Sequence, residues 1–213
     1  PNNPMPVSKP ITGLQAGENI LGVDFRPLNG QLYALGSSSR IYTLNLGTGA
    51  ATAVGAQFPT LLNGTDFGFD FNPTVDRIRV VSNTGQNLRL NPIDGTISAT
   101  DGMINPGTPT LSGAAYTNSF AGATTTELFV VDHATDKLFL QSPPNNGTLV
   151  ERGSLGIDIS NSNGFDIGST SNKAYLLATV SGVTKIYLVN TTNGSTTAVS
   201  TFPNTTRGFS VGL

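Results

Sequence analysis

The sequence contains no cysteine and no tryptophan. Without cysteine the chain can form no disulfide, thiolate nucleophile or thiolate metal site. Without tryptophan it lacks the largest aromatic platform for stacking a sugar ring. Charged residues make up only 11% of the 213 residues, well below the usual quarter. The net charge of −2 gives no general attraction to nucleic acid, so we expect no nucleic-acid partner.

Long apolar runs are missing as well. No stretch of about 18 apolar residues occurs, so the sequence predicts no transmembrane segment. No signal peptide is visible, and the opening PNNPMPVSKP is typical of a mature or trimmed terminus. Glycine, asparagine, threonine and serine take the place of charge, which favours many turns over disorder. This composition favours an extracytoplasmic location, in the periplasm or at the cell surface.

The clearest pattern in the chain runs from residue 68 to residue 101. Four short segments follow one another there, GFDFNP, RIRVVS, NLRLN and TISAT. Apolar and polar residues alternate in the second and third segments, which is the period of a β-strand. Turn residues separate the segments, and Asp94-Gly95 predicts a tight hairpin in which both central residues have positive φ.

The opening motif of this stretch recurs along the whole chain at intervals of roughly 45–50 residues. Its five copies are GVDF at 22–25, GFDF at 68–71, GAAY at 113–116, GFDI at 164–167 and GFSV at 208–211. A four-stranded unit repeated at this spacing is typical of a β-propeller, in which each unit is one blade. We therefore predict an all-β fold of radially packed, four-stranded antiparallel blades.

The predicted domain boundaries follow from these copies. An extended arm at 1–10 precedes a single propeller domain at 11–213, with blades at about 22–55, 68–101, 113–154 and 164–201 and a closing strand at 208–213. The sequence predicts five blades, the fifth incomplete and closed by both chain ends, with an outer strand near 11–15; the alternative is four blades. The missing strands of a fifth blade suggest roughly 20–30 further residues upstream in the native chain.

The runs ILGVDFRPLNGQLYALG, RIYTLN, GFDFNPTVDRIRVVS and GQNLRLNP make the chain resemble a bacterial family of secreted propeller-like domains of unknown function. The resemblance covers almost the whole chain, and its motifs are most specific in the first two blades. It implies an extracytoplasmic protein and no particular activity. Blade three departs from the repeat at Ala115, where the other copies have aspartate or serine.

Three aspartates form the sharpest candidate site. Asp24, Asp70 and Asp166 hold the third position of the repeated motif, and Ser210 holds it in the last copy. First strands line the channel of a propeller, so these carboxylates could bind a hard cation such as Ca²⁺. The alternative is that each carboxylate accepts hydrogen bonds from the neighbouring blade or pairs with an arginine such as Arg77 or Arg207, because the same polar groups must be hydrogen-bonded at every blade junction.

Other polar side chains are expected to be structural. His133, the only histidine, lies in the turn VDHATDK and is predicted to be a solvated turn residue. Arg77, Arg79 and Arg89 lie on two adjacent strands of blade two and could bind an anion. We expect them instead to pair on the same blade, with Asp66, Asp76 or Asp94.

Two classes of function fit these observations. The first is a non-catalytic scaffold or protein-interaction module, an accessory subunit of an envelope or membrane-bound complex. Its partner would bind a loop face formed by the links 56–67, 102–112 and 155–163, or the arm 1–10. The second is a metal-assisted hydrolase of the lactonase-propeller type, with Asn72 beside the three aspartates. A cell-surface glycan-binding domain is a further alternative.

Overall fold

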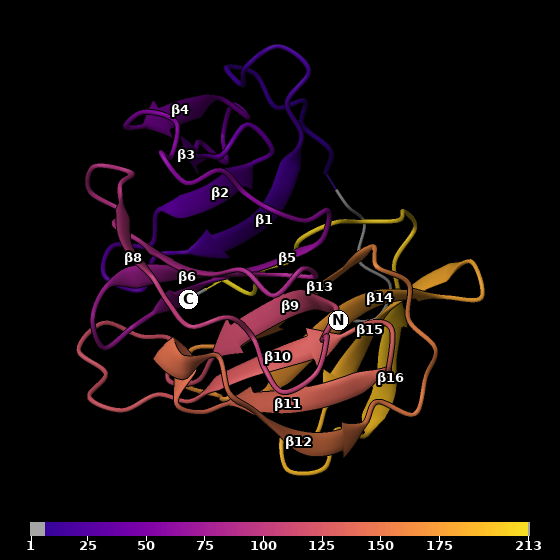
Figure 1. Ribbon diagram of the computed structural model, residues 1–213. Coiled ribbons are helices and arrows are strands. Elements are labelled where there is room, and N and C mark those ends of the chain that lie inside the picture. The colour runs from indigo at the N-terminus through magenta and orange to yellow at the C-terminus, as the bar shows by residue number, and fades with distance from the viewer. Residues whose placement is uncertain (1–6, 213) are drawn as a thin grey trace.

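The computed structural model describes residues 7–212. They form four antiparallel sheets of four strands each, arranged in a ring as the blades of a β-propeller (Figure 1). The described part contains no α-helix, only a short 3₁₀ helix, η1, at Pro144–Asn146. It therefore contains no helix long and apolar enough to cross a membrane.

Each sheet follows the chain order from an inner strand to an outer strand. Blade one contains β1 Ile20–Phe25, β2 Leu32–Gly36, β3 Arg40–Leu44 and β4 Ala51–Val54, and blade two contains β5 Phe67–Asn72, β6 Arg77–Ser82, β7 Asn87–Leu90 and β8 Ile97–Thr100. Blade three contains β9 Leu111–Tyr116, β10 Leu128–Asp132, β11 Lys137–Gln141 and β12 Leu149–Ser154, and blade four contains β13 Asn163–Ile167, β14 Ala174–Val180, β15 Val183–Val189 and β16 Thr196–Thr201.

The hydrophobic core lies between neighbouring blades. The alternation of apolar and polar residues gives each sheet two faces, and both faces of the inner strands are buried. Between blades one and two, the rings of Tyr33 and Phe71 pack edge to face with their centroids 5.2 Å apart. Because one blade cannot bury its own faces, the ring of blades is the stable unit.

The glycine of the repeated motif allows the inner strands to approach one another closely. A Cβ atom added to Gly68 would lie 2.6 Å from the Cβ of Ala114 on the next inner strand. The glycines of the other copies meet the second motif residue of the following copy in the same way, in the pairs Gly22 with Phe69, Gly113 with Phe165 and Gly164 with Phe209. A larger residue at this motif position would push neighbouring blades apart.

The last copy of the motif forms no blade, so five blades are not supported and the four-blade alternative fits. Residues 208–212 are extended but have no strand partner in the described chain. They nevertheless fill the gap between β13 and β1. The Gly208 amide donates to the Asn163 carbonyl at 3.1 Å, and a Cβ on Gly208 would lie 3.1 Å from the Cα of Gly22.

The segment before β1 does not supply an outer strand to a fifth blade. Thr12 instead makes a single parallel bridge to Ala50, at the start of the outer strand of blade one. The link before blade three makes the same bridge, between Asn105 and Thr148, so this contact belongs to the blade repeat. Residues 1–6 of the predicted arm lie outside the described residues, while Lys9 donates a hydrogen bond to the Gly47 carbonyl.

The prediction of a tight two-residue hairpin at Asp94-Gly95 is wrong. The loop extends from Asn91 to Thr96, with the Asn91 amide bonded to the Thr96 carbonyl at 2.8 Å and the Gly95 amide to the Asn91 carbonyl at 2.9 Å. Only the glycine has positive φ, at 73°, and the Asp94 carboxylate accepts the Thr96 amide instead. Such a longer loop needs left-handed backbone at one position only.

Candidate functional site

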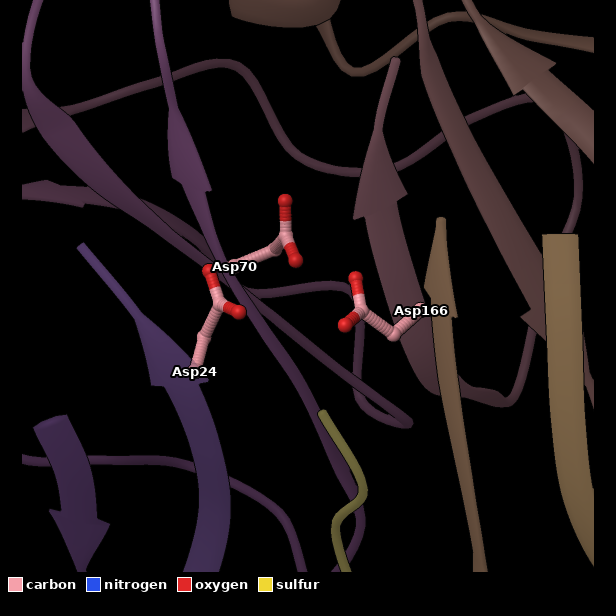
Figure 2. Close-up of side chains that lie close together, drawn as sticks. All are labelled: Asp24, Asp70 and Asp166. Carbon is pink, nitrogen blue, oxygen red and sulfur yellow. The ribbon is translucent and has the colours of Figure 1, made fainter. Parts of the chain in front are cut away.

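Asp24, Asp70 and Asp166 come together near the ends of the inner strands β1, β5 and β13. Their exposed fractions are only 3%, 2% and 3%. One carboxylate oxygen from each lies within 4.8 Å of the others. Figure 2 shows the three carboxylates directed toward a common point, with the yellow C-terminal segment passing beside them. The repeated motif therefore gathers three acids in the interior of the ring.

Each carboxylate binds the backbone of the next copy of the motif. In every case the acceptor is the third motif residue, and the donor is the amide of the fourth residue in the following copy. The bonds are Phe71 to Asp24 at 2.8 Å, Tyr116 to Asp70 at 2.8 Å, and Val211 to Asp166. The expectation that these side chains bond to the neighbouring blade is confirmed, whereas the proposed pairing with Arg77 or Arg207 is not observed.

Ser210 completes this cluster from the C-terminal segment. Its hydroxyl lies 2.8 Å from Asp24 Oδ1 and 3.1 Å from Asp166 Oδ2, and it bridges the first and last blades. Blade three supplies no side-chain acceptor because the equivalent position is Ala115. By the repeat pattern, a side-chain acceptor at position 115 would bind the Ile167 amide. That amide instead donates to the carboxylate of the adjacent Asp166 at 2.6 Å. The third motif position thus accepts or donates a hydrogen bond at every junction except that one, where Asn163 Nδ2 of β13 donates to Ser112 Oγ of β9 at 2.8 Å.

Burial changes the acidity of the whole cluster. It raises the pKa of Asp24 from 3.8 to about 6, against the opposing effect of its hydrogen bonds. The pKa of Asp70 lies well above its ordinary value because of burial and because the charges of Asp24 and Asp166 oppose its ionisation. Burial and the Asp24 charge also raise the pKa of Asp166. Protons therefore remain in the cluster at pH values that ionise exposed aspartates.

The cluster meets some, but not all, needs of a calcium site. Ca²⁺ takes about six to eight oxygen ligands, and the cluster offers three carboxylates that already accept backbone amides.

We expect that neither calcium nor EDTA shifts the midpoint of thermal unfolding at neutral pH, measured by circular dichroism. A calcium-dependent rise that Asp70→Asn abolishes would contradict this expectation and would revive the cation site.

The channel beside the inner strands leaves almost no free volume. A cavity of about 10 Å³ lies among the motif glycines Gly22, Gly68, Gly113 and Gly164 and the segment at Gly208. That volume holds one water molecule at most. This cavity among the motif glycines is therefore too small to hold a substrate.

The remaining residues proposed for a hydrolase are engaged in local structure. Asn72 accepts the Thr74 amide at 2.9 Å and the Thr74 hydroxyl at 2.7 Å, so it caps the turn between β5 and β6. His133 lies in the turn after β10, as expected, but it is half-buried rather than solvated, because the link before blade three covers it. Its amide donates to the Thr110 carbonyl at 3.2 Å.

The predicted partners of the blade-two arginines are wrong. Arg79 and Arg89 both bind Asp101, each at 2.7 Å from Oδ2, and Arg89 Nη2 also lies 2.9 Å from Oδ1. Arg77 donates only to backbone carbonyls. The expected acids bind elsewhere: Asp76 pairs with Arg26, Asp66 lies 3.6 Å from Arg207, and Asp94 binds its own turn.

Arg79 is a buried side chain of blade two that also contacts blade three. It is only 2% exposed, and its Nη1 also donates to Asn87 Oδ1 at 2.7 Å. Its Nη2 donates to Asn145 Oδ1 at 2.8 Å, and its Nε lies 3.3 Å from the Tyr116 hydroxyl. Nothing in the local pattern of blade two distinguishes Arg79 from Arg77, because two of the Arg79 partners, Asn145 and Tyr116, come from blade three.

A family model described as a domain of unknown function (DUF4394) matches residues 1–210. The chain belongs to this family. No curated protein matches it.

This DUF4394 chain is similar to several solved structures, one of them with a TM-score above 0.5. The crystal structure of glutaminyl cyclase from Myxococcus xanthus has a TM-score of 0.51 at 8% identity, over 83% of this chain and 76% of that one. The crystal structure of a putative 6-phosphogluconolactonase from Bacteroides uniformis has a TM-score of 0.46 at 20% identity, over 91% of this chain and 58% of that one. The structure of the Dos1 propeller has a TM-score of 0.49 at 14% identity, over 93% of this chain and 52% of that one. At these identities the similarity shows the fold alone.

Proposed function

We propose that this DUF4394 domain is a non-catalytic, extracytoplasmic β-propeller scaffold that binds another protein as an accessory subunit of a larger envelope or membrane-bound assembly. The observation that carries the proposal is a pair of exposed apolar side chains on the links between blades. Leu61 is 57% exposed and Met103 is 68% exposed. Both lie on the face that the links 56–67, 102–112 and 155–163 form.

These two side chains flank the same turn of blade two, at residues 83–86. The Leu61 carbonyl accepts a hydrogen bond from Gln86 Nε2 at 2.9 Å. The Met103 Cε lies over Gly85, where an added Cβ would be 3.5 Å away. An apolar pair on a polar face is the anchor that a protein partner uses, because burying the methionine and leucine side chains in an interface removes apolar surface from water.

The links around this pair are held in place before any partner binds. The Ile104 amide donates to the Gly85 carbonyl at 3.0 Å, and the Thr84 hydroxyl donates to the Asn63 carbonyl at 2.7 Å. Asn161 Nδ2 of a third link donates to Asp66 Oδ1 at 2.9 Å. A preorganised surface loses little conformational entropy on binding, which favours a stable contact.

The alternatives have weaker support. A lactonase-type hydrolase would use Asp24, Asp70 and Asp166, which are nearly inaccessible and bonded to backbone amides. A glycan-binding domain would present an exposed aromatic platform, and the sequence contains no tryptophan. The extracytoplasmic location is supported by the low charge of the chain and by its high content of asparagine, threonine and glycine.

Site-specific photo-crosslinking in the native host tests the proposal. A photoreactive amino acid at Leu61 or Met103 should give one shared adduct of higher mass, identified by mass spectrometry. Ile93 is the matched control, since it is also 68% exposed but lies on a turn of the outer strands of blade two. Equal adducts from Ile93, or none from Leu61 and Met103, would contradict a partner on this face.

A further inference from the structure

A cavity of about 460 Å³ lies between blades two and three, away from the face with Leu61 and Met103. Its walls include Arg79 and Arg89 from β6 and β7, and Tyr116 from β9. Its volume falls within the range of small-molecule pockets. Polar groups converge on it from two blades, which is how a binding site is built between repeats.

The cavity carries an excess of positive charge. Arg79 and Arg89 share one carboxylate, Asp101, so two guanidinium groups face a single negative charge. Asn87, Asn145 and Tyr116 complete the hydrogen bonds of Arg79 with neutral oxygens. These partners hold the charge without neutralising it. A low-charge protein rarely keeps an uncompensated guanidinium in a half-enclosed space without a use for it.

Arg89 is the group positioned to meet a ligand. It binds Asp101 through Nε and Nη2, and its side chain remains 32% exposed. Its Nη1 makes no hydrogen bond to any residue between 7 and 212. One edge of the guanidinium is therefore fixed by protein, and the other is available to an oxyanion. Arginine held in this way binds carboxylates with two parallel hydrogen bonds.

Hydroxyl groups line the opposite wall of the cavity. They come from Thr124, Thr125 and Thr126 in the insertion that only blade three has between its first two strands. The insertion is anchored, because Asn118 Nδ2 donates to the Thr125 carbonyl at 2.9 Å. Thr74 adds another hydroxyl from blade two. The hydroxyls of Thr126 and Thr74 already donate to the Thr117 carbonyl and to Asn72 Oδ1, so they are left to accept hydrogen bonds from a ligand that carries hydroxyls of its own.

We infer that this cavity binds a small hydroxylated carboxylate, with Arg89 holding the carboxylate and the threonines of the blade-three insertion contacting the hydroxyls. The inference goes beyond the proposed scaffold function and does not depend on it, because the two surfaces share no residue. The glutamates and aspartates that line other surfaces do not enter the cavity, so no acid other than Asp101 competes with the ligand.

Saturation-transfer NMR on the whole chain tests this inference with sodium glucuronate and gluconate as probes at millimolar concentration. Glucose is the neutral control, and inorganic phosphate, which has no carbon-bound proton to observe, is added as a competing anion. We expect signals from the two carboxylates, none from glucose, and little loss of the carboxylate signals when phosphate is added at equal concentration. In Arg89→Gln the carboxylate affinity should fall about tenfold or more, because the charge and the fork of donors are lost.

Arg77→Gln is the matched variant, since it removes an arginine from the neighbouring strand that donates only to backbone carbonyls. It should bind glucuronate as the wild type does. Arg89→Lys retains the charge next to Asp101 and guards against loss of folding, and it should still bind several-fold more weakly. The inference is overturned if neither carboxylate binds, if glucose also binds, if phosphate at equal concentration displaces the carboxylates, or if both Arg89 variants bind normally.

Discussion

Replacement of Arg79 by methionine should lower the free energy of unfolding by about 3 kcal/mol. The substitution keeps most of the side-chain volume but removes the charge that Asp101, Asn87 and Asn145 contact at 2.7–2.8 Å. Their oxygens would then be buried with fewer donors, and each unsatisfied group costs about 1–3 kcal/mol. Asp101 keeps Arg89, which is why we expect the lower part of the range for a broken buried ion pair.

Urea unfolding followed by far-ultraviolet circular dichroism measures this change, since the chain has no tryptophan for fluorescence. Arg77→Met is the matched control on the same strand. Its guanidinium contacts only the carbonyls of Val75 and Asp76, so its effect should stay within about 0.5 kcal/mol. Equal stabilities of the two variants would show that Arg79 does not join blades two and three.

Asp70→Asn should stabilise the protein at neutral pH, by about 2 kcal/mol, and should flatten the pH dependence of its stability. The asparagine oxygen can still accept the Tyr116 amide, which Asp70 binds at 2.8 Å. The amide cannot ionise, so the cost of ionising a buried carboxylate beside Asp24 and Asp166 disappears.

The direction of the pH effect follows from the raised pKa values. Asp24 has a pKa of about 6 in the folded protein against an ordinary 3.8, and burial also raises the pKa of Asp70 and Asp166. The folded protein therefore binds more protons than the unfolded chain from about pH 4 upward. Its free energy of unfolding should fall as the pH rises through 6, opposite to the behaviour of salt-bridged aspartates.

Chemical denaturation at a series of pH values checks this prediction. Asp158→Asn is the control, because it removes an exposed carboxylate that lies outside the cluster. We expect its curve to parallel that of the wild type. A wild-type stability that rises between pH 4 and 7, or an Asp70→Asn variant that is less stable at pH 7, would contradict the prediction.

Much of the architecture could be predicted from local patterns. The period-2 alternation predicted the strands of each blade, and the spacing of the glycine-containing motif predicted the four complete blades, together with an incomplete fifth that is not supported. The shared position of Asp24, Asp70 and Asp166 also predicted that they would meet near the axis. These features depend on short windows of sequence or on exact repetition, which the chain displays directly.

The partners of the blade-two arginines could not be predicted in this way. Arg79 binds Asn145 across 66 residues because an outer turn of blade three reaches blade two. Asp101 lies just beyond β8, and no spacing rule relates it to Arg79 and Arg89. The sequence interpretation therefore chose nearer acids on the same blade, and those acids proved to have other partners.

The sequence by itself determined the repeating unit, its strand order, the glycine at each inner junction and the aspartate at three of them, because these are properties of one blade and its copies. Only the tertiary structure decided how the ring closes. Residues 208–211 have the sequence of an inner strand, but a strand requires a partner for its backbone hydrogen bonds. Without one in the described chain, the segment fills a gap and binds Asp166 and Asp24 through Val211 and Ser210.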